Sequence, residues 1–258
     1  MKSEFSEFSY GYAVLDELIN WYGSPLDSVP EFPTTVAEAS LGYDARISAD
    51  GFALFLQFKV SDCMVKRTAF EATRGHFDPP FYRMHLRRIS KSRQHELLIE
   101  LENDQHFVFY VAPGFHRMLE LNNAYFSREI AAKSIWIRPS EIGGLPDTKD
   151  HHVSFKLPSN FVRYSEPKHL QGEYTIKSLI TSLQSREHDI ERFVLTEQRI
   201  ENLESRLLDL IRSHITGPEG WNIFPREISS TRNIGPIGRI AYLAHTFLDS
   251  EFLICRRK

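Results

Sequence analysis

Apolar side chains recur along this chain with two different periods, and the alternation of these periods predicts an α/β protein. Spacings of three and four residues, which are typical of one helix face, occur over 8–22, 90–102, 115–132, 178–215 and 237–252. Alternating or continuous apolar runs, which are typical of strands, occupy 43–49, 52–60, 81–89, 106–112, 134–139 and 153–157. We expect 106–112 to be a buried central strand, and 153–157 to be an edge strand.

A second region is predicted by a long amphipathic stretch near the C-terminus. No Gly or Pro interrupts residues 178–215, and their apolar positions keep near-helical spacing with charged residues between them. Such a stripe is usually a packing face, and it lacks the clean heptads of a coiled coil. We therefore predict an α/β domain over 1–175 and a C-terminal helical region over 176–258. A homodimer or a partner protein is compatible with the stripe.

A predicted β-hairpin over 43–60 holds the candidate chemistry. The Asp-Gly pair at 50–51 lies between two strand-like runs, and this pair is a strong signal for a two-residue hairpin loop. The resulting register places Asp44 directly opposite Gln57, with Cβ atoms about 4.5–5.5 Å apart. Because strand side chains alternate between faces, Lys59 shares the face of Gln57 and Asp44.

The surroundings of these residues separate a functional hairpin from an ordinary amphipathic one. A solvated polar face would look similar, but Ala53 and Phe55 lie on the same face as Gln57. The strand 52–60 is therefore apolar on both sides, as buried strands of α/β sheets are. Burial of Lys59 in such a strand would be costly and would indicate a functional role. A short helix predicted just upstream carries a second acid, Glu38.

These residues resemble the core of the PD-(D/E)xK nuclease superfamily, in the Mrr-type variant of restriction endonucleases whose strand reads QxK. The segment 57–59 matches that strand, Asp44 matches the acid on the preceding strand, and Glu38 matches the helical acid. The resemblance covers about residues 30–112, and it departs from the family pattern because no proline precedes Asp44. It implies a restriction endonuclease-like core, with a central mixed β-sheet flanked by helices, and metal-dependent phosphodiester hydrolysis.

The resemblance also implies a site for Mg²⁺ or Mn²⁺, cations that prefer oxygen ligands. Asp44 would be the principal ligand, with the Gln57 amide oxygen, the Phe58 carbonyl and Glu38 completing the set. The metal would lower the pKa of its bound water and hold the phosphate, while Lys59 would orient the water or neutralise developing charge. Because Gln57 replaces an acid, metal binding should strengthen when the substrate phosphate arrives.

Charge is unevenly distributed along the chain. The net charge of −3 does not indicate nucleic-acid binding, but the segment that follows the QxK strand is basic and rich in aromatic residues. Only Glu71 and Asp78 oppose its eight cations, which are Lys66, Arg67, Arg74, Arg83, Arg87, Arg88, Lys91 and Arg93. This pattern is typical of phosphate-backbone contact. The alternative is a solvated face that pairs with acids elsewhere.

Other features of the sequence narrow the class of protein. Cys63 and Cys255 are far apart, which argues against a disulfide framework or a zinc ribbon. We find no signal peptide and no run of about 18 apolar residues, so we expect a cytoplasmic protein without a membrane span. The sequence has no phosphate-binding P-loop and no nucleophile elbow. We interpret His95 as an ordinary surface or helix-packing histidine and 151–152 as part of a polar loop.

The sequence thus favours a metal-dependent nuclease that acts on DNA, and by resemblance its context would be restriction or anti-phage defence. One alternative is a catalytically inactive module of the same fold, which binds a partner protein or nucleic acid through its basic segment and C-terminal helices. Gln57 and the acidic net charge favour that alternative. An RNA-directed nuclease also stays open, because the hairpin does not distinguish RNA from DNA.

Overall fold

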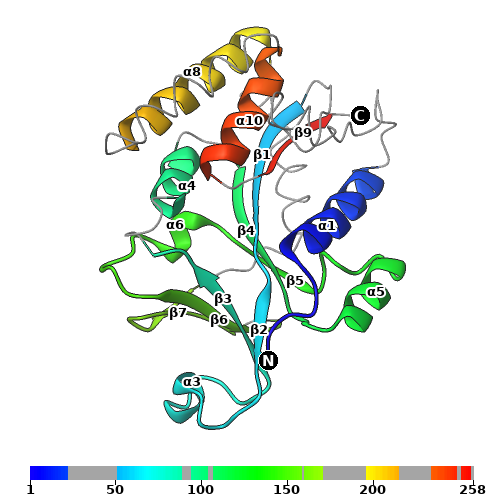
Figure 1. Ribbon diagram of the computed structural model, residues 1–258, viewed down its shortest axis with the longest axis vertical. Helices are drawn as coiled ribbons and strands as arrows, with labels where there is room; N and C mark the ends of the chain where they lie inside the picture. Colours follow the sequence, from blue (N-terminus) through cyan, green and yellow to red (C-terminus); the bar gives the residue numbers. More distant parts are fainter. Residues whose placement is uncertain are drawn as a thin grey trace. The chain divides into compact units, whose positions relative to one another are not determined.

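The computed structural model describes residues 1–22, 51–88, 94–103, 107–158, 160–170, 196–214, 234–248 and 251–256 (Figure 1). The chain divides into two compact units. The first unit comprises Met1–Gly23, Phe58–His95 and Phe109–Glu187, and the second comprises Ser24–Gln57, Glu96–Val108 and His188–Lys258. The predicted boundary near residue 176 stays a prediction.

An antiparallel sheet in the first unit has the strand order β2-β3-β6-β7-β8. Its strands are β2 (Ser61–Met64), β3 (Phe81–Leu86), β6 (His151–Lys156), β7 (Asn160–Tyr164) and β8 (Lys168–His169). Because side chains alternate along each strand, one face carries the buried residues Met84, Val153 and Phe155. The opposite face carries polar residues at the paired positions Arg83–Ser154 and His85–His152.

The prediction of an edge strand at 153–157 is wrong, because β6 lies between β3 and β7. The strand also begins two residues earlier than the apolar pattern indicated, at His151. Both histidines that we assigned to a polar loop are therefore strand residues, and they point to opposite faces of the sheet. The error arose because polar side chains that are buried in hydrogen bonds look like loop residues in a sequence. Strands β7 and β8 were not predicted.

A second sheet has the order β5-β4-β1-β9. Its strands are β1 (Gly51–Phe58), β4 (Phe107–Pro113), β5 (Ser134–Ile137) and β9 (Glu251–Arg256). The prediction of a buried central strand is confirmed by β4, which lies between β5 and β1 and whose residues 108–112 are buried. β1 pairs antiparallel with β9, from Gly51 opposite Arg256 to Leu56 opposite Glu251. The predicted hairpin partner, 43–49, lies outside the described residues.

The helix predicted over 237–252 is correct only in its first part. α10 (Pro236–Leu248) ends four residues earlier, and the chain continues as β9. The sequence of β9, EFLICR, is rich in residues that suit a half-buried pleated strand. Its pairing with β1, which is far away in sequence, decides the conformation.

The other helices are α1 (Glu7–Tyr22), α3 (Phe70–Thr73), α4 (Gln94–Asn103), α5 (Met118–Phe126), α6 (Pro139–Ile142) and α8 (Glu197–His214). The helix predicted over 8–22 is confirmed by α1. The helix predicted over 90–102 is confirmed by α4 from Gln94 on, and its first residues lie outside the described ranges. α5 is shorter than the predicted 115–132. In the second unit, α8 packs against α10 and buries its apolar stripe at Leu203, Leu207 and Ile211. The rest of 178–215 is outside the described residues, apart from Thr196, so a dimer or partner surface there stays a prediction.

The molecule is therefore an α/β protein with one mixed and one antiparallel sheet and flanking helices, which confirms the predicted class. The finer restriction endonuclease-like arrangement stays a prediction. None of the helices in the described ranges has the length and hydrophobicity needed to cross a membrane.

Candidate functional site

The end of β1 carries the described part of the predicted nuclease motif. Gln57, Phe58 and Lys59 are all buried, with exposed fractions of 2%, 7% and 5%. The preceding residues Phe55 and Leu56 are fully enclosed, so five consecutive residues are buried and both strand faces are covered. This confirms the expectation for 55–59 and leaves a lysine in an environment where charge is costly.

The N-terminal helix positions a carboxylate beside this lysine. The Lys59 Nζ lies 3.8 Å from Glu7 Oε2, and Glu7 Oε1 accepts a hydrogen bond from the Val60 backbone N–H at 3.4 Å. The Glu7 side chain is 43% exposed, so water reaches one side of the ion pair. Sequence analysis missed Glu7 because 53 positions separate it from Val60, and no local spacing connects them.

The position of Glu7 follows from how α1 is anchored. The Ser6 hydroxyl accepts a hydrogen bond from the Ser9 N–H at 3.1 Å, as an N-cap residue does, and the helix begins at the next residue. The rings of Tyr10 and Phe58 meet edge to face, with centroids 6.0 Å apart. At Gly11 a Cβ atom would lie 2.8 Å from the Phe58 ring, so only glycine lets the helix approach this closely.

The other predicted metal ligands are the carboxylates Glu38 and Asp44. Glu38 and Asp44 lie outside the described residues, and within the described part of the chain no group of three or more His, Cys, Asp or Glu side chains could hold a metal ion. The described donors are the Gln57 amide oxygen and the Phe58 carbonyl, which are hard oxygen ligands of the type that Mg²⁺ accepts. These two donors fit the predicted metal as members of a larger set.

The structure separates the members of the basic segment into three groups. Lys66, Arg67 and Arg74 are exposed around α3. Arg83 and Arg88 form ion pairs with Glu71 and Asp150, respectively. Arg87 is exposed, and Lys91 and Arg93 lie outside the described residues. The exposed residues remain candidates for phosphate contact, whereas Arg83 is held by an internal acid.

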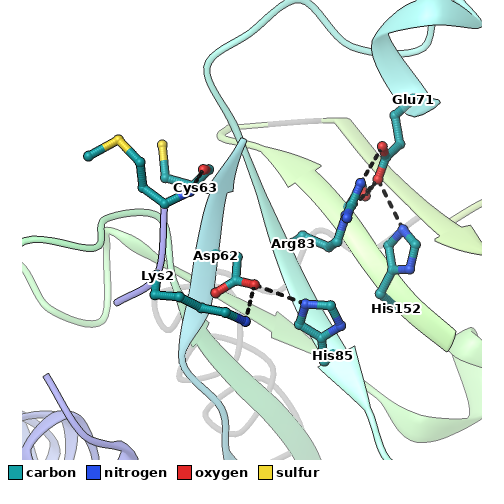
Figure 2. A network of polar contacts seen from close by, with 9 residues as sticks. Lys2, Asp62, Cys63, Glu71, Arg83, His85 and His152 are labelled. Atoms are coloured by element: carbon teal, nitrogen blue, oxygen red, sulfur yellow. Dashed lines mark hydrogen bonds and ion pairs between the residues drawn. The ribbon is translucent and has the colours of Figure 1, made fainter. Parts of the chain in front are cut away.

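Glu71 is the centre of a buried polar network that sequence analysis did not find (Figure 2). Its carboxylate is fully enclosed and accepts hydrogen bonds from Arg83 Nε and Nη2 at 2.9 and 2.6 Å and from Ser154 Oγ at 2.6 Å. His152 Nε2 lies 3.0 Å from the same carboxylate. Burial alone would raise the pKa of Glu71, but the hydrogen bonds from His152, Arg83 and Ser154 hold it well below its usual value.

Aromatic contacts extend the network along β7. The His152 ring stacks on Tyr164, with centroids 5.2 Å apart and an interplanar angle of 17°, and the Tyr164 hydroxyl is hydrogen-bonded to His76 Nδ1. Burial lowers the pKa of His152 despite the neighbouring Glu71. Burial and the charge of Glu71 raise the pKa of Tyr164 to about 12. His152 is therefore neutral near pH 7, with Nε2–H donating to the Glu71 carboxylate.

A second carboxylate, Asp62, lies on the same sheet face as this network and closer to solvent (Figure 2). Its Oδ2 is 2.8 Å from Lys2 Nζ and 3.1 Å from His85 Nε2. Partial burial acts to raise the pKa of Asp62, but Lys2 and His85 lower it. The His85 and His152 rings are neighbours, with centroids 6.0 Å apart.

The signal for the Glu71 network is absent from any short stretch of sequence. Glu71 lies 12 positions from Arg83, 81 from His152 and 83 from Ser154. The register of β3 against β6 brings these partners together. By contrast, His95 has the role expected from sequence: it is buried in α4, with Nδ1 3.1 Å from the Tyr110 hydroxyl and Nε2 2.9 Å from the Gly143 carbonyl.

The chain matches no protein-family model, no curated protein and no solved structure. The resemblance to the PD-(D/E)xK superfamily therefore stays a prediction from the residues at 38–59.

Proposed function

We propose that the protein is a metal-dependent nuclease that hydrolyses phosphodiester bonds, with DNA as its expected substrate. One observation carries the proposal: Gln57 and Lys59 are buried at the end of a strand whose neighbouring residues are apolar. Enclosing an ammonium group costs several kcal/mol, of the order of the penalty for one ion after relaxation. A lysine that is buried at this cost within a QxK motif favours a catalytic role for Lys59 over a purely structural one.

The roles of the residues follow from their chemistry. The Gln57 amide oxygen and the Phe58 carbonyl would hold Mg²⁺ together with Asp44 and Glu38. The bound metal would supply a water of lowered pKa and a counter-charge for the phosphate. Lys59 would donate hydrogen bonds from its buried position, where it could orient that water or stabilise the negative charge that develops on phosphorus-bound oxygens.

Glu7 would act through Lys59. Its carboxylate lies 3.8 Å from the ammonium group, close enough to restrict where that group lies. Because Glu7 is partly exposed, the ion pair is open to solvent on the α1 side. Glu7 is therefore a positioning residue in this proposal.

The proposal is tested with a cleavage assay on plasmid, linear duplex, single-stranded DNA and RNA, with Mg²⁺ or Mn²⁺ and with EDTA as the control. Lys59→Met removes the charge and keeps most of the side-chain volume, so it is preferred to Lys59→Ala. Lys133→Met is a matched control, because Lys133 lies in an exposed pair with Glu129. We expect metal-dependent cutting by the wild type and the control, and cutting by Lys59→Met that is slower by about 100-fold or more. Metal-dependent cutting at the wild-type rate by a folded Lys59→Met would overturn the assignment.

The alternative of an inactive binding module makes a different prediction for the same assay. Such a protein would cut none of the four substrates with either metal, and Asp44→Ala would leave its binding unchanged.

A further inference from the structure

The short helix α3 buries a charged side chain and exposes an apolar one. Its glutamate, Glu71, is fully enclosed, whereas Phe70 beside it is 46% exposed. Helices that pack on a sheet normally bury their apolar side chains and expose their charges. Here the carboxylate is directed into the sheet by Arg83, Ser154 and His152. These hydrogen bonds fix the helix on β3 and β6, with Phe70 toward solvent.

The exposed ring is supported from behind. Phe70 contacts Tyr164 edge to face, with centroids 5.8 Å apart and an interplanar angle of 81°. Tyr164 is itself fully buried and stacked on His152. The Arg74 guanidinium lies over the Phe70 ring at 4.3 Å from its centroid. The ring is therefore held in a defined orientation while about half of its residue surface remains open.

The surface around Phe70 is basic. Lys66, Arg67 and Arg74 are exposed, and Val65 adds exposed apolar area. Glu71, the acid within residues 65–76 of the sequence, faces inward and is paired with Arg83. The segment 65–76 therefore presents an aromatic ring and three cations to solvent, a combination that matches stacked bases and backbone phosphates.

We propose that the segment 65–76 binds single-stranded nucleic acid. An unpaired base stacks on the layer formed by the Phe70 ring and the Arg74 guanidinium that lies over it, and the flanking phosphates contact Lys66 and Arg67. A duplex offers the same phosphates but keeps its bases stacked inside, so it does not reach the ring without unpairing. The inference builds on the proposed nuclease function by naming a single-stranded stretch as the form of the substrate that this surface holds.

The test is a binding measurement in EDTA, so that cleavage does not interfere. Fluorescence anisotropy of a labelled oligothymidylate of about 20 nucleotides, long enough to exceed a typical single-strand site, is compared with a duplex of equal length. The variants are Phe70→Ala, which removes the ring, and Phe70→Trp, which retains an aromatic face. Phe126→Ala serves as the matched control, because Phe126 is an exposed phenylalanine on α5.

Loss of one stacked base corresponds to about a 5- to 150-fold weaker affinity, from the stacking contribution of about 1–3 kcal/mol per base. We expect this loss for Phe70→Ala on the single strand, little change on the duplex, and near wild-type binding for Phe70→Trp and Phe126→Ala. Unchanged single-strand binding by Phe70→Ala, an equal loss on both substrates, or no single-strand binding by the wild type would each overturn the proposal. Thermal unfolding of each variant excludes a folding defect as the cause.

The binding surface and the nuclease function fail in different ways. If single-strand binding depends on Phe70 but no metal-dependent cutting occurs, the nuclease function fails and the surface stands. If cutting depends on Lys59 while Phe70→Ala binds and cuts normally, the surface fails and the nuclease function stands.

Discussion

Two clusters of buried charge in the first unit show how the same physical cost can serve different purposes. Lys59 is enclosed beside a glutamate, Glu7, that is 43% exposed. Glu71 is fully enclosed, although the side chains of Arg83 and His152 keep exposed fractions of 20% and 17%. Its carboxylate accepts three hydrogen bonds of 2.6–2.9 Å from Arg83 and Ser154. The first cluster is open to solvent at Glu7, whereas the carboxylate of the second is fully enclosed. We infer that the open cluster is suited to chemistry and the closed cluster to fixing the structure.

The difference has an energetic consequence. Removing one partner from a closed pair leaves an uncompensated buried charge, which costs about 3–5 kcal/mol. At the open cluster a neighbouring solvent contact limits that penalty, so a substitution there should affect catalysis more than folding. Each of the following experiments compares the two clusters by measuring rate and stability together.

The largest effect is expected at Lys59. Lys59→Met should reduce the single-turnover rate of metal-dependent cleavage at least about 100- to 1,000-fold, the cost of removing one group that stabilises transition-state charge. Its free energy of unfolding, measured in urea, should change less than that of Glu71→Gln. If Lys59→Met loses more stability than Glu71→Gln and keeps its cleavage rate, the roles assigned to the two clusters are reversed.

The next effect is on stability, at Glu71. Glu71→Gln should lower the free energy of unfolding by about 3–5 kcal/mol, because Arg83 then lacks its buried counter-charge. Urea unfolding followed by circular dichroism measures this change. Glu129→Gln, in an exposed pair with Lys133, is the matched control and should change little. The double variant Glu71→Gln/Arg83→Met should recover part of the lost stability. If it recovers none, the loss in Glu71→Gln does not come from leaving Arg83 unpaired.

The closed cluster also predicts how stability depends on pH. The pKa of Glu71 is lower in the folded protein than in the unfolded chain. Glu71 therefore contributes fully to the free energy of unfolding above its unfolded pKa of about 4.3, and this contribution is lost as the pH falls toward its folded pKa. The pKa of His152 is also lowered, so stability begins to fall below its unfolded value of about 6.5 for the same reason. Urea unfolding of the wild type and His152→Gln at several pH values measures these slopes.

His152→Gln should flatten the slope just below pH 6.5, and Glu71→Gln should flatten the slope below about pH 4.3 more than His152→Gln does. A wild-type stability that rises as the pH falls from 6.5 would contradict the sign of the His152 shift.

The elements that sequence analysis found are those whose pattern is local. β4 is a continuous apolar run, and its burial followed directly from that run. β9 was interpreted as the end of a helix, because its identity depends on pairing with β1 about 200 positions earlier. The start of β6 was missed since His151 and His152 are polar, although both are held by hydrogen bonds within the fold.

The same distinction holds for the candidate site. Gln57 and Lys59 are two positions apart, so a short motif indicated them, and their burial agrees with the expected two-sided strand. Glu7 and the partners of Glu71 are brought into place by a helix anchor and by strand register. Chemistry that is assembled from distant segments leaves no spacing to recognise.

The smallest effect on stability is expected at Lys2, which forms an exposed ion pair. This pair tests whether burial, and not the mere presence of an ion pair, determines how much a charged contact contributes to stability. Lys2 Nζ lies 2.8 Å from Asp62 Oδ2, a distance as short as those around Glu71, but the Lys2 side chain is 84% exposed. Pairs of this kind contribute about 0–1 kcal/mol and are screened by salt. Lys2→Met should therefore lower the free energy of unfolding by less than about 1 kcal/mol, and the difference should shrink as salt is added. A loss as large as that of Glu71→Gln would show that distance alone determines the strength of these pairs, and the contrast between open and closed clusters would then have no energetic basis.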